Sequence, residues 1–70
     1  MNTKIEFWLN GETYYLNKTV KLSDLIEYFN YEKTLLVLEY NRFVCNKNDW
    51  EKILVSNLDK IEIVTIVGGG

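Results

Sequence analysis

The residues best placed to do chemistry stand at the end of the sequence, where Gly68, Gly69 and Gly70 follow Val67. Glycine combines a free choice of φ and ψ with the absence of a Cβ, so such a tail fits a narrow protein channel. Three residues reach roughly 10 Å beyond the preceding strand. We therefore predict that the α-carboxylate of Gly70 is the reactive group and that Gly68 and Gly69 thread into a partner.

The side chains offer little conventional catalysis. The sequence has no histidine and one cysteine, Cys45, which excludes a histidine triad, a Cys/His zinc site and an internal disulfide. Cys45 follows Phe43 and Val44, and we interpret it as a small hydrophobic residue rather than a nucleophile. Glu39 and Glu62 could face each other as an acid/base pair, although isolated glutamates on strands are usually solvated. We expect no catalytic side chain, no metal and no bound cofactor.

The composition predicts one small globular domain. Seventy residues with 47% hydrophobic and 26% charged residues suit a single domain, which we assign to 1–67 with a flexible tail at 68–70. The net charge of -2, with neither sign clustered, argues against a nucleic-acid partner. The longest apolar stretch is Leu35 to Leu38, too short for a membrane span, and the first residues resemble no signal peptide. We expect a location in the cytoplasm or in an organelle stroma.

Apolar patterning predicts four or five strands and one helix. Ile5 to Leu9 alternates and is followed by Asn10-Gly11, which favours a type I′ hairpin turn. Further strands are expected at Glu12 to Leu16, Leu35 to Tyr40, Phe43 to Cys45 and Ile61 to Val67, with a loop at 46–49, a core-covering Trp50 and a turn at 57–59.

The helix is predicted from about Leu22 to Asn30, because apolar residues recur there at helical spacing. Lys21 stands where a capping Ser or Thr is usual, so Ser23 is an alternative cap.

One helix and this strand order predict an α+β fold of the β-grasp type, with a mixed sheet and the helix on one face. The final strand is nearly all apolar, as expected of a central strand. Alternation places Ile61, Ile63 and Thr65 on the helix side, and Glu62, Val64 and Ile66 on the open side. Glu62, Val64, Ile66 and Val67, joined by Val37, are therefore the predicted partner interface, with scattered surface hydrophobes as the alternative.

These residues resemble the ThiS family, the ubiquitin-like β-grasp sulfur carriers of thiamin biosynthesis. The resemblance spans nearly the whole chain and depends on Asn10-Gly11, the segment 22–26, Glu39-Tyr40-Asn41, Trp50 and above all the block 59–70. Leu58 departs from the pattern, because Gly normally precedes Asp there. Leucine disfavours a positive φ, so we expect Asn57 to take that conformation.

The resemblance implies that the protein is a cosubstrate rather than an enzyme. An E1-like adenylyltransferase of the ThiF type would use MgATP to adenylylate the Gly70 carboxylate. Sulfur from a persulfide donor would then replace AMP to give a thiocarboxylate, which thiazole synthase of the ThiG type would consume. Two alternatives remain: the small subunit of molybdopterin synthase, which shares the fold and the terminal chemistry, and a β-grasp interaction module whose tail is inert.

Overall fold

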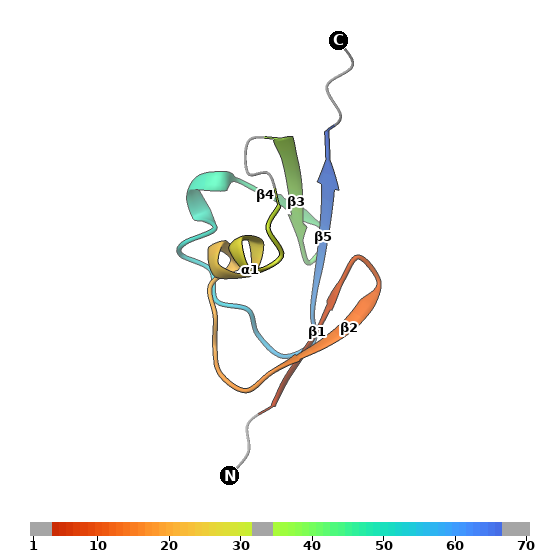
Figure 1. Ribbon diagram of the computed structural model, residues 1–70, viewed down its shortest axis with the longest axis vertical. Helices are drawn as coiled ribbons and strands as arrows, with labels where there is room; N and C mark the ends of the chain where they lie inside the picture. Colours follow the sequence, from red (N-terminus) through yellow and green to blue (C-terminus); the bar gives the residue numbers. More distant parts are fainter. Residues whose placement is uncertain (1–3, 32–34, 67–70) are drawn as a thin grey trace.

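The computed structural model describes residues 4–31 and 35–66, which form a five-stranded sheet with one α-helix packed on it (Figure 1). The sheet order is β2-β1-β5-β3-β4, with β1 and β5 parallel and the other pairs antiparallel. This confirms the predicted β-grasp architecture and the central place of the last strand. The elements are β1 (Ile5–Leu9), β2 (Glu12–Leu16), α1 (Leu22–Tyr28), β3 (Leu36–Tyr40), β4 (Phe43–Cys45), the 3-10 helix η2 (Lys47–Asp49) and β5 (Asp59–Thr65).

The first hairpin has the predicted turn. Asn10 and Gly11 both have positive φ, 51° and 83°, as a type I′ turn requires. Asn10 also extends the contact between β1 and β5 beyond the end of β1, because its N–H donates to the Ile61 carbonyl at 2.9 Å and its Oδ1 accepts the Ile63 N–H at 2.8 Å. The turn therefore fixes the hairpin and supports the central strand.

Helix α1 ends two residues before its predicted end, at Tyr28. Asn30 takes a φ of 60°, its N–H bonds the Glu27 carbonyl, and the Tyr31 N–H bonds the Ile26 carbonyl. This is a Schellman motif, in which asparagine serves as the left-handed residue that is more often glycine. The helical spacing of Phe29 continues past the true end because Phe29 still packs against the core.

The start of α1 corrects the capping hypothesis for Ser23. Lys21 is the N-cap, and its backbone N–H donates to the Asp24 carboxylate at 3.1 Å. Ser23 lies within the first turn, where its N–H bonds the Trp50 carbonyl at 3.0 Å. The loop carbonyl thus supplies the partner that a capping hydroxyl would otherwise provide.

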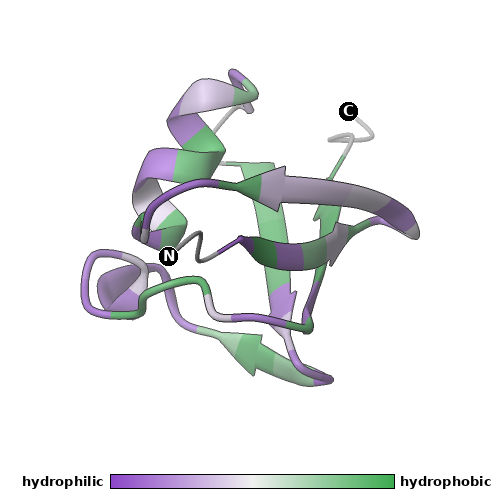
Figure 2. Ribbon diagram, turned by 90° about the horizontal axis from the view of Figure 1, so that it is seen from below, coloured by the Kyte–Doolittle hydropathy of each residue, from purple (hydrophilic) through white to green (hydrophobic). Residues whose placement is uncertain are grey.

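The core lies between α1 and the sheet. Trp50 is buried at the edge of this core, as predicted, and its Nε1 donates to the Cys45 carbonyl at 3.2 Å. Hydrophobic residues line the inner side of α1, whereas its outer side is largely hydrophilic (Figure 2). The buried hydrophobic residues are Phe7, Leu9, Leu22, Leu25, Ile26, Leu38, Trp50, Val55, Ile61 and Ile63.

Several predicted boundaries were wrong by one or two residues. The segment at 46–49 contains η2 rather than an irregular loop, and β3 begins at Leu36. Strand β5 begins at Asp59 rather than Ile61, because Asp59 and Lys60 already pair with Phe7 and Trp8 of β1. Leu58 itself takes the positive φ, 70°, so the expectation that Asn57 would do so was also wrong. Asn57 instead accepts the Glu6 N–H through Oδ1 at 2.9 Å.

Candidate functional site

The predicted interface residues on β5 alternate as the sequence pattern indicated. Ile61 and Ile63 are buried against α1, whereas Glu62 is exposed and Val64 and Ile66 expose 59% and 52% of their surface. Thr65 was assigned to the helix side but is exposed, because the core does not extend to the last residue of the strand. Val67, Gly68, Gly69 and Gly70 lie outside the described residues, so their predicted roles stay predictions.

The neighbouring strands add valines and a glutamate to the open side of β5. In the antiparallel register, Val37 is opposite Val64 and Glu39 is opposite both Glu62 and Val44. Directly opposite residues share a face of the sheet. We refer to these five residues, Val37, Glu39, Val44, Glu62 and Val64, as the valine–glutamate face. Hydrophobic residues are prominent along β4 and the end of β5 (Figure 2).

This face lies beside the end of the described chain. The Ile66 N–H donates to the Leu35 carbonyl, which continues the pairing of β5 with β3 one residue past the strand. The path of the chain toward the glycines is therefore fixed as far as residue 66. The exposed apolar residues beside this end of the described chain include Ile66, Val64 and Val37.

The opposite end of β5 is held by a buried polar network that sequence reasoning missed. Asp59, only 6% exposed, accepts hydrogen bonds from the Tyr40 hydroxyl at 2.6 Å, the Asn41 Nδ2 at 3.1 Å and the Ser56 N–H at 2.7 Å. Burial, followed by the hydrogen bond to Asp59, raises the pKa of Tyr40 to about 12. Asn41 also bonds the Lys60 N–H and C=O groups, at 2.8 and 2.7 Å. The motif that carries the family resemblance contains Tyr40, Asn41 and Asp59, but the hydrophobic periodicity of the sequence did not indicate that their side chains contact one another.

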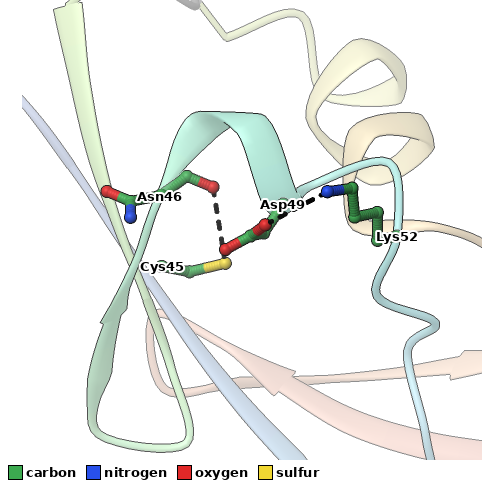
Figure 3. A network of polar contacts seen from close by, with 4 residues as sticks. All are labelled: Cys45, Asn46, Asp49 and Lys52. Carbon is green, nitrogen blue, oxygen red and sulfur yellow. Dashed lines mark hydrogen bonds and ion pairs between the residues drawn. The ribbon is translucent and has the colours of Figure 1, made fainter.

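Cys45 lies on the helix side of β4 beside η2, and its surroundings do not activate it (Figure 3). Burial, followed by the nearby Asp49 carboxylate, raises the pKa of the Cys45 thiol. Its Sγ lies 3.8 Å from the Asn46 carbonyl, while Lys52 is 3.9 Å from Asp49. A reactive cysteine usually has nearby cations that stabilise its thiolate, and its sulfur is accessible to a substrate. The surroundings of Cys45 therefore favour the prediction that it packs as a hydrophobic residue.

The described part of the chain has neither a metal-binding cluster nor a membrane-spanning helix. Within residues 4–31 and 35–66, no three His, Cys, Asp or Glu side chains are grouped so that they could hold a metal ion. No helix among these residues is long and apolar enough to cross a membrane.

The ThiS family model matches residues 7–70, which covers the sheet, the helix and the glycine tail. The chain belongs to the ThiS family. It is accordingly a sulfur-carrier-like β-grasp protein, a small carrier rather than a catalyst, and the family in general interacts with E1-like and sulfur-transfer partners.

The chain is also similar to other sequences and to a solved structure. The chain is 59% identical to the uncharacterized protein ycf40 of Trieres chinensis over 70 residues, which covers all of this chain and 96% of the relative. The ycf40 protein of Porphyra purpurea is 29% identical over 70 residues, which covers 99% of that protein. The fold is similar to that of the thiamine biosynthesis protein ThiS from Geobacter metallireducens, with a TM-score of 0.81 and 17% identity, covering 94% of this chain and all of that structure.

Proposed function

We propose that the protein carries sulfur for thiazole formation in thiamin biosynthesis, as a thiocarboxylate on Gly70. The observation that carries this proposal is the family match, which continues through the three glycines to residue 70. It is supported by the placement of β5, which connects the core to the beginning of the tail. The carboxylate is poor as an acyl donor until one of its oxygens becomes part of a phosphate leaving group.

The proposed chemistry requires two partners. In an E1-like enzyme of the ThiF type, a Gly70 carboxylate oxygen attacks the α-phosphorus of MgATP and pyrophosphate leaves. The sulfur of a persulfide donor then attacks the acyl carbon and AMP leaves, and a thiol reduces the resulting S–S bond to release the thiocarboxylate. A thiazole synthase of the ThiG type takes up that sulfur. MgATP and the catalytic groups belong to the partners.

The docking surface in this proposal is the predicted interface. Val64 and Ile66 expose more than half of their surface beside the end of β5, and Val37 is directly opposite Val64. Exposed apolar groups grouped in this way are typical of protein-binding sites. Glu62 lies on the same face, and Val67 continues the chain toward Gly68 and Gly69.

The intact mass of the protein tests the proposal. After incubation with the E1-like enzyme and MgATP, we expect a gain equal to an adenylyl group. Addition of a persulfide donor and a thiol should replace one oxygen by sulfur. The chain without Gly70, and the chain with a C-terminal amide, should fold normally and show neither change. An unmodified wild-type chain, with an enzyme that is active on another carrier, would favour the inert interaction module.

Complementation separates the two sulfur-carrier pathways. We expect the gene to restore growth of a thiazole auxotroph and not of a molybdopterin auxotroph. Rescue of the second strain alone would assign the chain to molybdopterin synthase. We also propose a plastid stroma as the compartment, because the ycf40 relatives are from plastid genomes. Fractionation of the source cells would check this location.

A further inference from the structure

The apolar pattern of β5 fits two registers against its neighbours. In the observed register, Tyr40 is opposite Ile61 and Leu38 is opposite Ile63. Because side chains alternate between the two faces of a strand, a slip by one residue turns every apolar side chain to the wrong face, whereas a slip by two does not. If β5 were drawn back by two residues, Ile63 would take the place of Ile61 and apolar side chains would still face α1. We call this movement the inward slip.

The asparagines that hold β5 do not distinguish these two registers. Asn10 donates to the Ile61 carbonyl and accepts the Ile63 N–H. Asn41 bonds the N–H and the carbonyl of Lys60 in the same way. Every residue of β5 offers an N–H and a carbonyl, so these bonds could form again two residues further along the strand. The asparagines therefore hold the strand without choosing which of its residues they bond.

The buried Asp59 carboxylate does distinguish the registers. It accepts the Tyr40 hydroxyl at 2.6 Å and the Asn41 amide at 3.1 Å, both on the neighbouring strand or its turn. After the inward slip, Ile61 would take the place of Asp59 and could accept neither bond. A slip in the other direction would carry Asp59 to the place of Ile61, which is only 1% exposed. An ionised carboxylate without partners is costly there, so only the observed register satisfies Asp59.

A single buried polar group can specify register even where it adds little to stability. We propose that Asp59 is a positioning residue: by selecting the register of β5, it sets how far the tail of Gly68, Gly69 and Gly70 reaches toward a partner. The inward slip would shorten this reach by roughly 7 Å, the length of two residues of extended strand. The effect on sulfur carriage rests on the proposed function, whereas the selection of the register does not.

The test makes β5 apolar in both registers. Asp59→Val with Tyr40→Phe replaces both partners of the buried hydrogen bond by apolar groups, which is far less costly than removing one of them. Thr65 would take the place of Ile63 after the inward slip, so Thr65→Val is added to give a triple variant. Thr65 is exposed, so Thr65→Val alone is a matched control that retains Asp59. Asp59→Asn, which keeps an acceptor oxygen, is the conservative control.

Cross-strand nuclear Overhauser effects between β3 and β5 report the register. The wild type and both controls should show the Hα–Hα contact between Leu38 and Ile63 alone. The triple variant should fold and show a second contact of comparable intensity, between Leu38 and position 65. The first contact alone in the triple variant would overturn the inference, and so would the second contact in either control. A triple variant that does not fold would also overturn it, because Asp59 would then be required for stability itself.

Adenylylation of Gly70 by the E1-like enzyme reports the reach of the tail. Two extra glycines before Gly70 should slow adenylylation of the wild type and of Thr65→Val about tenfold, because the carboxylate is then misplaced. The same insertion should change the rate of the triple variant less than twofold, since it restores the reach of the slipped form.

Equal slowing of the triple variant and of Thr65→Val would overturn the link between register and reach, as would a wild type that the insertion does not slow. A wild type that is not adenylylated at all, by an enzyme that is active on another carrier, would count against the proposed function. The contacts between β3 and β5 would still decide whether Asp59 selects the register.

Discussion

The two ends of β5 differ in how they are held. From Asp59 to Ile61 the strand pairs with β1, Ile61 also pairs with Tyr40 of β3, and the buried Asp59 bonds Asn41 in the turn after β3. At Val64 and Thr65 it pairs with β3, whereas the register with β1 has already ended at Ile61. The stabilising contacts are therefore concentrated at the start of β5, and the exposed apolar surface is concentrated at its end. Strand β5 thus has a hydrogen-bonded first end and an accessible last end.

The largest effect should come from removing the carboxylate at the fixed end. Asp59→Ala leaves the Tyr40 hydroxyl, the Asn41 amide and the Ser56 N–H without their acceptor. Hydrogen bonds to a charged acceptor contribute more than neutral ones, and Asp59 accepts three, so we expect a loss of about 3 kcal/mol in the free energy of unfolding. Urea unfolding measures this. Asp49→Ala, which removes a solvent-exposed contact with Lys52, should cost far less.

A smaller loss is expected when the hydroxyl in the same network is removed. Tyr40→Phe removes the hydrogen bond to Asp59 and should lower the free energy of unfolding by about 1.5 kcal/mol. The network also predicts a pH dependence. The folded-state pKa of Tyr40, about 12, is above the ordinary value of 10.0, so its contribution to stability is complete below pH 10 and is lost as the pH rises toward 12.

The tyrosinate absorbance of Tyr40→Phe, subtracted from that of the wild type at each pH, should show the titration of Tyr40 near pH 12. The stability difference between the two proteins should shrink over the same interval. A difference spectrum centred at pH 10 would mean that the hydroxyl does not donate to Asp59 in solution.

A gain of stability is expected just before β5. Leu58 has a φ of 70° and its side chain is 56% exposed. A left-handed conformation costs a non-glycine residue roughly 1–2 kcal/mol, while glycine loses about 0.5–1 kcal/mol more backbone entropy on folding. Leu58→Gly should therefore raise the free energy of unfolding by about 0.5–1 kcal/mol. Leu54→Gly, at an exposed position with no positive φ, should not be stabilising.

The sequence predicted what depends on periodicity and on single turns. Alternation in β5 placed Val64 and Ile66 on the open side, and Asn10-Gly11 predicted the first turn. It could not predict what depends on contacts between distant segments. The Asp59–Tyr40 bond joins residues 19 apart, and the strained Leu58 is tolerated because tertiary structure fixes the turn. The helix start was misjudged for the same reason, since a loop carbonyl caps it.

The smallest change in stability should come from the accessible end of β5. Val64→Thr keeps the β-branched shape and the pairing with Val37 but adds a hydroxyl to the open face. Because Val64 is 59% exposed, the free energy of unfolding should change by less than about 0.5 kcal/mol. Binding to the E1-like enzyme should nevertheless weaken severalfold, because the hydroxyl must lose its water when the face is covered.

Thr13→Val, an exposed position on edge strand β2, is the reciprocal control and should leave binding unchanged. Unaltered binding of Val64→Thr would show that the partner reaches the tail without covering this face, and the division of β5 into a stabilising end and a binding end would then fail.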